Sequence, residues 1–320
     1  MKVLKYQQKA VEELVDKTIE LLSLAGQRHT LVFEAPTGAG KTIMASEMLM
    51  RLCTELTERA DAPCSEVAFM WIAPNKLHEQ SYFKMKTFFT ETRELHPVVY
   101  DDMDHSANGY IHPGEILFVN WESINKDNAL MIRDTEQSAS LYDLTRRTQI
   151  EQEIPLIVII DEEHEGSYKQ DKSPRYHARE VAARMARERG CALVLGSATP
   201  SLEALGRCRA GAWGGVSWTR VSMPERPGGA RLPKVRVVDM AEQFRGGGRS
   251  VFSAPLAEAL RGVAERGEKA VLLLNRRGFA NFLMCRECGC VPECPHCSCA
   301  LTYHERGHYL ACHTCGRTWP

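Results

Sequence analysis

The sequence predicts an α/β fold in which helices cover both faces of a parallel sheet. Three observations support this prediction. Short apolar runs alternate with amphipathic stretches, a glycine-containing loop at 35–42 follows one of these runs, and another run at 156–160 ends in adjacent carboxylates. Continuous apolar strands separated by helices are typical of a parallel sheet that is buried on both sides.

The spacing of apolar residues places the individual elements. Apolar runs that suit a buried strand lie at 30–34, 67–73, 116–120, 156–160 and 192–196. Helical spacing is found at 6–24, 41–53, 76–89 and 176–189. Glycine and proline concentrate at 224–233 and 246–248, which indicates a linker. A helix at 254–265 and a strand at 269–274 then begin a second α/β unit.

Charged residues are distributed unevenly along the chain. The 320 residues have a formal net charge of −1. Residues 1–164 contain 16 basic and 27 acidic side chains, which gives −11, whereas residues 165–320 contain 24 basic and 14 acidic ones, which gives +10. Such an asymmetry suggests that the basic half faces an anionic partner. The near-zero total therefore does not exclude a nucleic-acid-binding protein.

Composition excludes several classes of protein. A hydrophobic content of 44% and a charged content of 25% are those of an ordinary globular protein. No apolar run approaches the roughly 18 residues of a membrane span. The N-terminal residues 1–22 are charged and amphipathic, without the apolar centre of a signal peptide. We therefore expect a cytoplasmic protein without a membrane partner.

The segment 35–42 has the composition of a phosphate-binding loop. It reads Ala-Pro-Thr-Gly-Ala-Gly-Lys-Thr between a predicted strand and a predicted helix, which is the context that such a loop requires. Gly38 and Gly40 let backbone N–H groups face phosphate oxygens, and the helix N-terminus favours negative charge. Lys41 is expected to reach the β- and γ-phosphates of ATP, and Thr42 to hold Mg²⁺. A plain glycine-rich turn is the alternative. The candidate ATP-binding residues of the loop are Thr37, Gly38, Ala39, Gly40, Lys41 and Thr42.

A second motif, Asp161-Glu-Glu-His164, follows the apolar run at 156–160. The carboxyl ends of parallel strands are where such sheets bind ligands. Asp161 is expected to bind Mg²⁺, and Glu162 to position the attacking water. A charged loop after a buried strand is the alternative, but the upstream phosphate loop favours catalysis. The candidate catalytic residues are therefore Lys41, Asp161 and Glu162.

The order and spacing of these motifs resemble the superfamily-2 helicases and translocases, with a DEAH-like box. The resemblance implies RecA-like domains that bind ATP and Mg²⁺. It also implies that Ser197 and Thr199 couple the nucleotide state to nucleic-acid binding by communicating with His164. Shorter strings take the places of the adenine-recognising glutamine motif at Gln7, motif Ia at 72–75, a strand-contacting motif at 119–125 and motif III at 196–200.

The second half closely resembles the primosomal protein N′ family of bacterial replication-restart helicases, above all at 161–170 and 175–180. In that family this stretch is an aromatic-rich loop that links DNA contact to ATP hydrolysis. Aromatic rings can stack on unpaired bases and basic side chains can contact phosphates. A solvated basic turn is the alternative. The candidate DNA-binding residues are Tyr168, Lys169, Lys172, Arg175, Tyr176 and Arg179.

Eight of the twelve cysteines lie between Cys285 and Cys315. In a reducing compartment such clustering indicates metal binding, with disulfides as the alternative. Two C-x2-C pairs can supply four thiolates to a tetrahedral Zn²⁺. The resemblance implies that Cys285 and Cys288 share a second zinc with a downstream pair that this chain does not reach. The candidate ligands are Cys285, Cys288, Cys294, Cys297, Cys312 and Cys315.

The first 160 residues resemble a different group. The segments 34–42, 119–126 and 127–153 are more similar to DEAD/DEAH helicases of the type III restriction-subunit group. The two resemblances and the charge reversal meet at 161–164, a string that both families share. We therefore hypothesise that the chain is a chimera joined at this motif.

Four segments are expected along the chain. They are a first RecA-like domain at 1–222, a linker at 223–250, the beginning of a second RecA-like domain at 251–283 and an incomplete Cys-rich zinc-ribbon insertion at 284–320. In such motors the second domain supplies an arginine finger, which contributes roughly 10³ to 10⁵ in turnover. We therefore expect nucleotide binding but only weak hydrolysis by this chain.

The leading interpretation is an ATP-dependent DNA helicase or translocase of the primosomal replication-restart type. Its expected partners are single-stranded or branched DNA such as forks, together with single-strand-binding and primosomal proteins. One alternative is the ATPase subunit of a type III restriction system, which the first half favours. The other is a non-catalytic nucleic-acid-binding zinc module with an inert nucleotide-binding domain.

Overall fold

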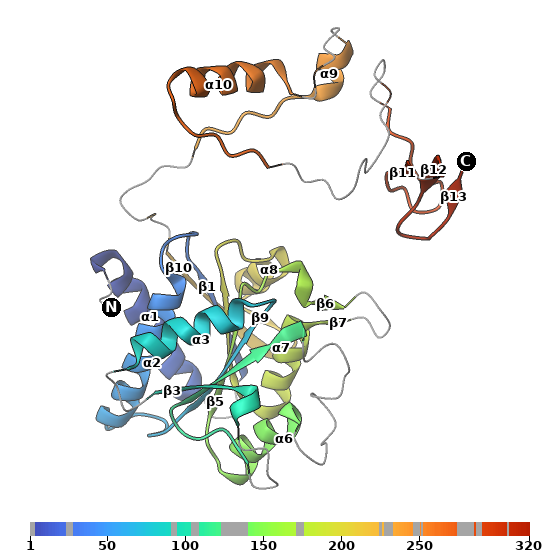
Figure 1. Cartoon of the computed structure of the whole chain (residues 1–320). Coiled ribbons are helices and arrows are strands. Elements are labelled where there is room, and N and C mark those ends of the chain that lie inside the picture. Colours follow the sequence, from blue (N-terminus) through green and yellow to red (C-terminus); the bar gives the residue numbers. More distant parts are fainter. Residues whose placement is uncertain are drawn as a thin grey trace. The chain divides into compact units, whose positions relative to one another are not determined.

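The structure, a computed structural model, divides the chain into two units, Met1–Arg231 and Leu232–Pro320 (Figure 1). It describes residues 4–23, 28–90, 95–103, 109–122, 140–170, 176–223, 226, 233–245, 250, 252–273, 285, 290–305 and 307–320. Within these ranges, no helix combines the length and the apolar character that crossing a membrane requires.

The first unit is built around an eight-stranded sheet in the order β3-β4-β2-β5-β8-β1-β10-β9. All neighbouring strands are parallel except the pair β10 and β9. The predicted α/β fold with a parallel sheet is therefore confirmed. The strands are β1 (Arg28–Glu34), β2 (Ala68–Ala73), β3 (His96–Val99), β4 (Glu115–Asn120), β5 (Leu156–Asp161), β8 (Ala192–Ser197), β9 (Ala212–Trp213) and β10 (Val216–Ser222). A separate two-stranded ribbon consists of β6 (Lys169–Gln170) and β7 (Tyr176–His177).

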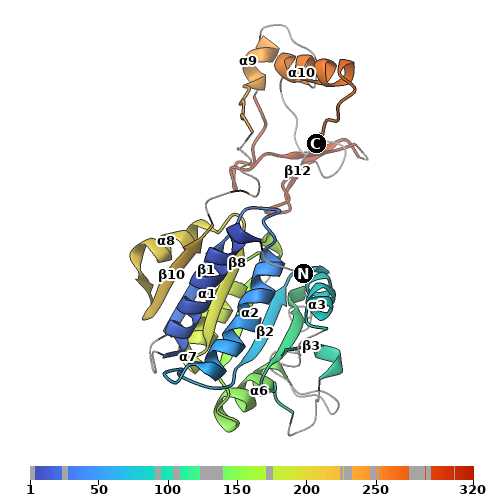
Figure 2. The same cartoon turned by 90° about the vertical axis from the view of Figure 1, so that its left-hand side faces the viewer.

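Helices cover both faces of this sheet (Figure 2). Successive side chains of a strand point to opposite faces, so that Leu31 and Phe33 of β1 join one core while Val32 joins the other. The first core includes α1 (Lys5–Ser23), α2 (Lys41–Glu58) and α3 (Leu77–Phe88). The second includes α6 (Leu141–Arg146), α7 (Ala178–Arg189) and α8 (Leu202–Ala210). Three single-turn helices complete the unit: η1 (Tyr100–Asp102), η2 (Arg147–Glu151) and η3 (Gly166–Tyr168).

Serine side chains fix where two of these helices begin. Ser140 accepts a hydrogen bond from the N–H of Asp143, and Ser201 accepts one from the N–H of Ala204. Each serine thereby satisfies a backbone donor that the first helical turn leaves without a partner. The N-cap Ser201 directly follows the predicted motif III, so this motif leads straight into α8.

The second unit contains two helices and a small antiparallel sheet. The helices are α9 (Met240–Arg245) and α10 (Ala254–Glu265), and the sheet consists of β11 (Thr302–His304), β12 (Tyr309–Ala311) and β13 (Thr318–Trp319) in that order. The helix predicted at 254–265 is confirmed. The strand predicted at 269–274 is wrong for its described part, because 269–273 has no regular structure and Val271 and Leu273 are exposed. A strand needs hydrogen-bond partners on a neighbouring strand, and the described part of this unit offers none there. Of the predicted linker at 223–250, residues 224–225, 227–232 and 246–249 lie outside the described ranges.

Candidate functional site

The predicted phosphate-binding loop joins β1 to α2 at the carboxyl edge of the sheet. Gly38 and Gly40 have φ angles of 80° and 84°, in the left-handed region that glycine adopts without strain. Gly40 is also the N-cap of α2 and gives no side-chain bond, so the first N–H groups of this helix remain available to an anion. The loop therefore has the backbone form that phosphate binding requires.

Gln7 of α1 contacts the backbone of this loop through its side chain. Its buried side chain donates from Nε2 to the carbonyl oxygen of Ala39 at 2.7 Å and accepts from the N–H of Leu4 at 2.8 Å. A Cβ atom on Gly40 would lie 2.6 Å from the same Nε2. The Gln7 amide thus fixes the path of the loop, and its predicted role in recognising adenine stays a prediction.

The lysine of the loop meets the acidic motif that follows β5. Lys41 Nζ lies 2.7 Å from Glu162 Oε1, and both side chains are largely buried. β5 ends at Asp161, and Glu162 then adopts a φ of 53°, which is unusual for a residue other than glycine. The three predicted catalytic residues, from two separate loops, therefore lie together.

The carboxyl group of Asp161 has an unusual environment. Burial raises its pKa to about 6; the negative charge of Glu162 adds to this rise, and the positive charge of Lys41 opposes it. Two carboxylates thus share one ammonium group, and the site favours additional positive charge. The Asp161 carboxylate and the Thr42 hydroxyl are the kind of oxygen ligands that Mg²⁺ prefers.

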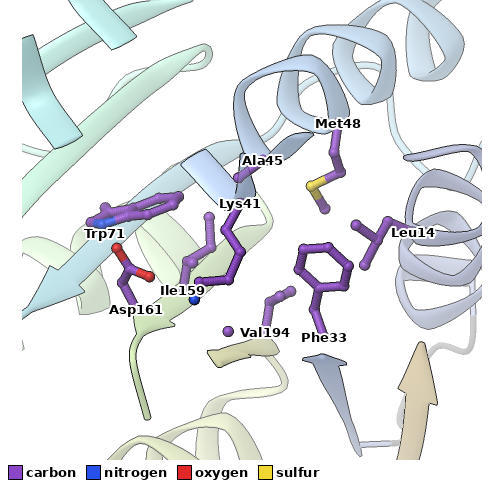
Figure 3. Close-up of a pocket in the computed structure, with 10 residues that line it drawn as sticks. Leu14, Phe33, Lys41, Ala45, Met48, Trp71, Ile159, Asp161 and Val194 are labelled. Atoms are coloured by element: carbon purple, nitrogen blue, oxygen red, sulfur yellow. The ribbon is translucent and has the colours of Figure 1, made fainter. Parts of the chain in front are cut away.

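A small cavity lies between the sheet and the helices α1 and α2 (Figure 3). Its volume is about 30 Å³, and apolar side chains such as Leu14, Phe33 and Trp71 line it together with Lys41 and Asp161. This volume suits about one water molecule. Its apolar lining leaves the Asp161 carboxyl poorly solvated, and its volume is far too small for a nucleotide.

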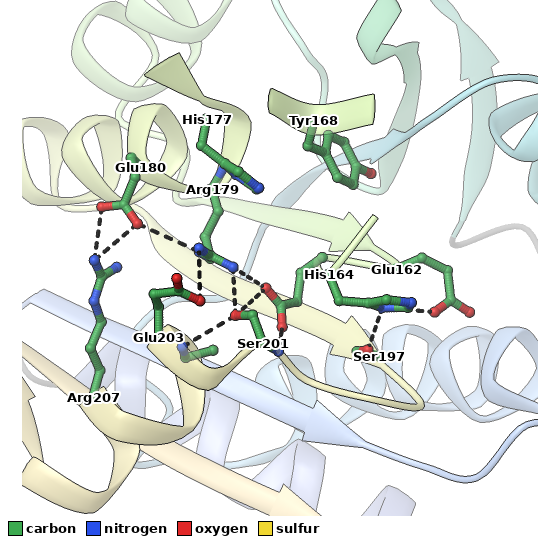
Figure 4. Close-up of polar contacts among 12 residues, drawn as sticks. Glu162, His164, Tyr168, His177, Arg179, Glu180, Ser197, Ser201, Glu203 and Arg207 are labelled. Carbon is green, nitrogen blue, oxygen red and sulfur yellow. Dashed lines mark hydrogen bonds and ion pairs between the residues drawn. The ribbon is translucent and has the colours of Figure 1, made fainter. Parts of the chain in front are cut away.

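The predicted coupling residues contact one another. His164 Nδ1 lies 2.7 Å from the Ser197 hydroxyl and 3.6 Å from Glu162 Oε2 (Figure 4). The same hydroxyl accepts a hydrogen bond from the N–H of Thr199 at 3.0 Å. The acidic motif after β5 and the predicted motif III after β8 are therefore joined through side chains, and the role of this contact in coupling stays a prediction.

Two of the predicted DNA-binding residues are buried. Tyr168 has no exposed surface, and its hydroxyl lies 2.7 Å from the carbonyl oxygen of Asp161 and 3.1 Å from that of Ile72. Arg179 is 5% exposed and pairs with Glu163 at 2.6 Å. The prediction that these two side chains contact DNA does not fit their burial, because a base or a phosphate cannot reach them.

The remaining predicted DNA-binding residues have other positions. Lys169 is exposed on β6, and Tyr176 of β7 is half-buried with its ring edge-on to Trp121 at 6.1 Å. Lys172 and Arg175 lie outside the described residues. Only the two described members can therefore be placed on the ribbon of β6 and β7.

Two residues that organise this region lie inside predicted motifs, but their structural roles were not predicted. Glu163 is completely buried and accepts hydrogen bonds from Arg179 and Ser201. Trp121 directly follows β4 and lies 6.0 Å from the Tyr168 ring. Ser201 had one sequence signal, because a serine followed by an acidic residue in the next turn is typical of a helix start. Nothing in the sequence marked Glu163 as buried.

Four cysteine side chains of the second unit converge on one point. The Sγ atoms of Cys294, Cys297, Cys312 and Cys315 lie within 4.8 Å of one another, and those of Cys294 and Cys315 are 3.8 Å apart. Four Zn–S bonds of about 2.3 Å in a tetrahedron place sulfur atoms about 3.8 Å apart. These residues form the predicted four-cysteine zinc site.

The backbone around this site supports its thiolates. The N–H groups of Ser298 and Gly316 donate to the carbonyls of Cys294 and Cys312, so that each cysteine pair sits in a turn. The backbone N–H of Cys315, together with that of Thr314, lowers the pKa of Cys312 to about 6. Burial and the neighbouring thiols raise the pKa of Cys297, so Cys312 carries negative charge more readily than Cys297, and a thiolate is the form that binds zinc.

The other predicted zinc pair does not join this group. Cys285 is exposed and is not among the four converging cysteines, and Cys288 lies outside the described residues. Among the described residues, Cys294 to Cys315 is the only group of cysteine, histidine and acidic side chains arranged to hold a metal ion. The predicted metal role of Cys285 and Cys288 therefore stays a prediction.

Comparison with known families agrees with this geometry. Residues 1–202, more than half of the chain, match the family described as type III restriction enzyme, res subunit. The chain belongs to this family. Residues 294–320 match the PriA DNA helicase Cys-rich region domain. This member of the type III restriction res-subunit family thus combines a superfamily-2 helicase domain with a PriA-type Cys-rich region, as the two resemblances predicted.

Curated relatives of this res-subunit family member are replication restart proteins called PriA. The chain is 49% identical to that of Bacillus subtilis over 164 residues, which is 51% of this chain and 20% of the relative. It is 40% identical to that of Haemophilus influenzae over 159 residues, which is 50% of this chain and 21% of the relative. It is 41% identical to that of Synechocystis over 176 residues, which is 50% of this chain and 20% of the relative. The chain is therefore a PriA homologue over half of its length, and it spans about a fifth of the length of these relatives.

Proposed function

We propose that this chain is an ATP-dependent DNA helicase or translocase of the replication-restart type. The contact between Lys41 Nζ and Glu162 Oε1 carries the proposal. It joins the phosphate-binding loop to the carboxylate that would act on water, at the edge of a parallel sheet where ligands bind. The similarity to relatives named replication restart proteins supports the type of helicase.

The residues of the loop would bind the nucleotide. The N–H groups of Gly38 to Lys41 would face the phosphates, and Lys41 would pair with the β- and γ-phosphates. Thr42 and Asp161 would hold Mg²⁺, which would supply positive charge to the phosphate oxygens. Binding of the γ-phosphate draws Lys41 away from Glu162, because the phosphate competes for the same ammonium group. The freed Glu162 carboxylate then orients the attacking water and accepts its proton.

DNA would bind through the basic half of the chain. Residues 165–320 contain 24 basic and 14 acidic side chains, and the exposed Lys169 lies on the ribbon next to the acidic motif. We assign phosphate or base contacts to Lys169, Lys172, Arg175 and Tyr176. The expected substrates are forks and other branched or single-stranded DNA, with single-strand-binding and primosomal proteins as further partners.

Zinc would stabilise the end of the second unit. Among the described residues, the buried cluster there consists of Cys294, Leu301 and Cys312, which is too little apolar surface for so short a segment to fold by itself. Four thiolates on one Zn²⁺ would supply the missing cross-links. We assign a structural role to this site.

The domain boundaries are part of the proposal. The first RecA-like domain would span 1–222, the linker 223–250, the beginning of a second RecA-like domain 251–283 and the zinc region 284–320. The division of the chain after Arg231 supports a linker in this region, because it falls inside 223–250.

A comparison of three variants tests the ATPase proposal. Lys41→Ala should abolish binding of a fluorescent ATP analogue with Mg²⁺, whereas Glu162→Gln should keep binding and abolish the slow turnover that fork DNA stimulates. Lys17→Ala is the matched control, because Lys17 is an exposed helical lysine paired with Glu20. Turnover of the wild-type chain that does not exceed that of Lys41→Ala would refute hydrolysis.

The match of residues 1–202 to the type III restriction res subunit favours a second candidate, a restriction-system ATPase. Filter binding separates the candidates. A replication-restart motor should bind forks more tightly than linear duplex of equal length, and ATP should change that affinity. A restriction ATPase should respond to linear duplex as well. An inert zinc module should show an affinity that salt changes and ATP does not.

A further inference from the structure

Glu163 is a buried carboxylate next to the proposed catalytic Glu162, and the proposed reaction gives it no role. It has no exposed surface. Its Oε2 accepts from Arg179 Nη1 at 2.6 Å and from the Ser201 hydroxyl at 3.0 Å, and its Oε1 accepts from the Ser201 N–H at 2.6 Å. All the strong contacts of this carboxylate are therefore made inside the protein.

Arg179, at the beginning of α7, supplies the opposite charge. Its side chain is 6% exposed, and Nη1 reaches both Glu163 and the Ser201 hydroxyl, the latter at 2.5 Å. Its Nε lies 3.5 Å from Glu180, which also accepts from Arg207 at 2.9 Å. Burial by itself would raise the pKa of Glu180, but Arg207 and Arg179 together lower it. The arginine is thus held from several sides.

A buried ion pair of this kind fixes position more than it adds stability. Removing both charges from water costs about as much as their attraction returns, but losing one partner leaves the other charge buried and unpaired. The Glu163 side chain therefore cannot turn away from Arg179 and Ser201 without a large penalty. The residues that are bonded to Glu163, along the chain or through hydrogen bonds, are therefore held in place with it.

The residues attached to this pair are those of the proposed active site. Glu163 follows Glu162, whose φ of 53° is strained, and its own N–H donates to the Gly196 carbonyl at 3.0 Å. Ser201 follows the segment 196–200, which contains Ser197 and Thr199. The N–H of Thr199 donates to the Ser197 hydroxyl. Through Ser201 and its own N–H, Glu163 consequently joins the loop after β5 to the loop after β8.

We infer that Glu163 and Arg179 are positioning residues that hold Glu162 and the segment 196–201 in the geometry for ATP hydrolysis. The inference rests on the proposed hydrolysis of ATP. Neither residue touches the nucleotide, so nucleotide affinity should not depend on them. Turnover should depend on them, because small displacements of a reacting group lower rates strongly.

The test compares Arg179→Lys, Arg179→Met and Glu163→Gln with Arg184→Gln in the full chain. Arg184 pairs with Glu188 at 2.8 Å on the surface of the same helix, so it is a matched control. Lysine keeps the charge of Arg179 but lacks the planar fork that reaches two partners. For each variant we would measure the Kd of a fluorescent ATP analogue with Mg²⁺, the turnover with fork DNA, and amide exchange by mass spectrometry.

The positioning role predicts a specific combination of results. In the three variants at Glu163 and Arg179, the Kd should stay within about twofold while turnover falls roughly 10- to 100-fold. Amide exchange should accelerate at 161–165 and 196–202 and stay unchanged in the central strand β2. Arg184→Gln should change none of these quantities.

Two results would overturn the inference. The first is unchanged exchange at 161–165 and 196–202 in variants that lack the pair. The second is an equal increase of exchange throughout the first unit, as for a pair that only stabilises the fold. If the wild-type chain turns over ATP no faster than Lys41→Ala, the proposed hydrolysis fails, and the exchange pattern still decides the positioning role. If Arg179→Met does not fold, the same measurements on Arg179→Lys decide the positioning role.

Discussion

Replacement of Asp161 by asparagine should stabilise the first unit while it removes function. The pKa of Asp161 rises from an ordinary value of 3.8 to about 6, chiefly because of burial. A difference of one pK unit corresponds to about 1.4 kcal/mol between the two protonation states. The ionised carboxylate therefore costs up to about 3 kcal/mol of folding free energy at pH 7. Asparagine has nearly the same shape and no charge, so we expect a gain of about 1–3 kcal/mol.

The pH dependence of this gain has a definite sign. Between about pH 4 and pH 6 the folded state binds a proton at Asp161 that the unfolded state does not, so stability falls as the pH rises through this window. The advantage of the Asp161→Asn variant should consequently be largest at pH 7 and disappear near pH 4. Urea unfolding at several pH values, analysed at constant m, measures the gain in unfolding free energy and its dependence on pH.

Asp143 offers a control of opposite sign. The Ser140 hydroxyl donates to Asp143 and, with Arg146 and Arg147, lowers its pKa. Asp143→Asn should therefore destabilise the protein modestly at pH 7. An Asp161→Asn variant that is no more stable than the wild type at pH 7, or whose advantage persists at pH 4, would refute this account of Asp161.

Three further predictions concern the same structure. Because Mg²⁺ binding needs an ionised Asp161, affinity for the ATP analogue with Mg²⁺ should fall about tenfold from pH 7 to pH 5, with a midpoint near pH 6; a flat profile would contradict this role. A strong zinc chelator should remove amide protection at 290–320 and leave the first unit unchanged; protection that survives loss of the zinc would argue against a structural site. Tyr168→Phe should cost about 1 kcal/mol of stability, for the lost hydrogen bond, and Tyr168→Ala about 3–5 kcal/mol, for the emptied core. Equal losses in these two variants would show that the ring does not pack as described.

The phosphate-binding loop and the zinc site could be predicted because short segments determine them. The positive φ angles of Gly38 and Gly40 need glycine, and the converging cysteines come as two pairs with fixed spacing. The acidic motif was placed correctly because β5 is a continuous apolar run that ends at Asp161. Each of these features is marked by residues that lie close together in the sequence.

The burial of Tyr168 could not be predicted, since it depends on distant residues. Its hydroxyl reaches the carbonyl of Ile72, 96 positions earlier in the chain, and its ring packs near Trp121. A tyrosine with an apolar ring and a polar tip suits both a core and a binding surface. Charged residues such as Glu163 are almost never fully buried unless paired, and the pairing with Arg179 appears only in three dimensions.

Three strands of the main sheet were not predicted: the two-residue β9, β10 and β3. β10 alternates between buried and less buried residues, because it lies near the end of the sheet and is not a continuous apolar run. β3 is four residues long, contains Pro97 and lies at the opposite edge, where proline is tolerated. Strands near the edge of a sheet are covered less completely, so apolar runs identify them poorly.

The position of β1 in the sheet affects how the protein folds during its synthesis on the ribosome. β1 lies between β8 and β10, where Thr30 pairs with Leu193 and Arg28 with Val216. At a synthesis rate of about 5–20 residues per second, Val216 is added roughly 10–40 s after Arg28. For most of this interval, from residue 42 to residue 191, the nascent chain contains every residue of the phosphate-binding loop but neither of the strands that flank β1. The loop is therefore among the last parts of the first unit to take shape, because β1 stays without its neighbouring strands until β8 and β10 have been synthesised.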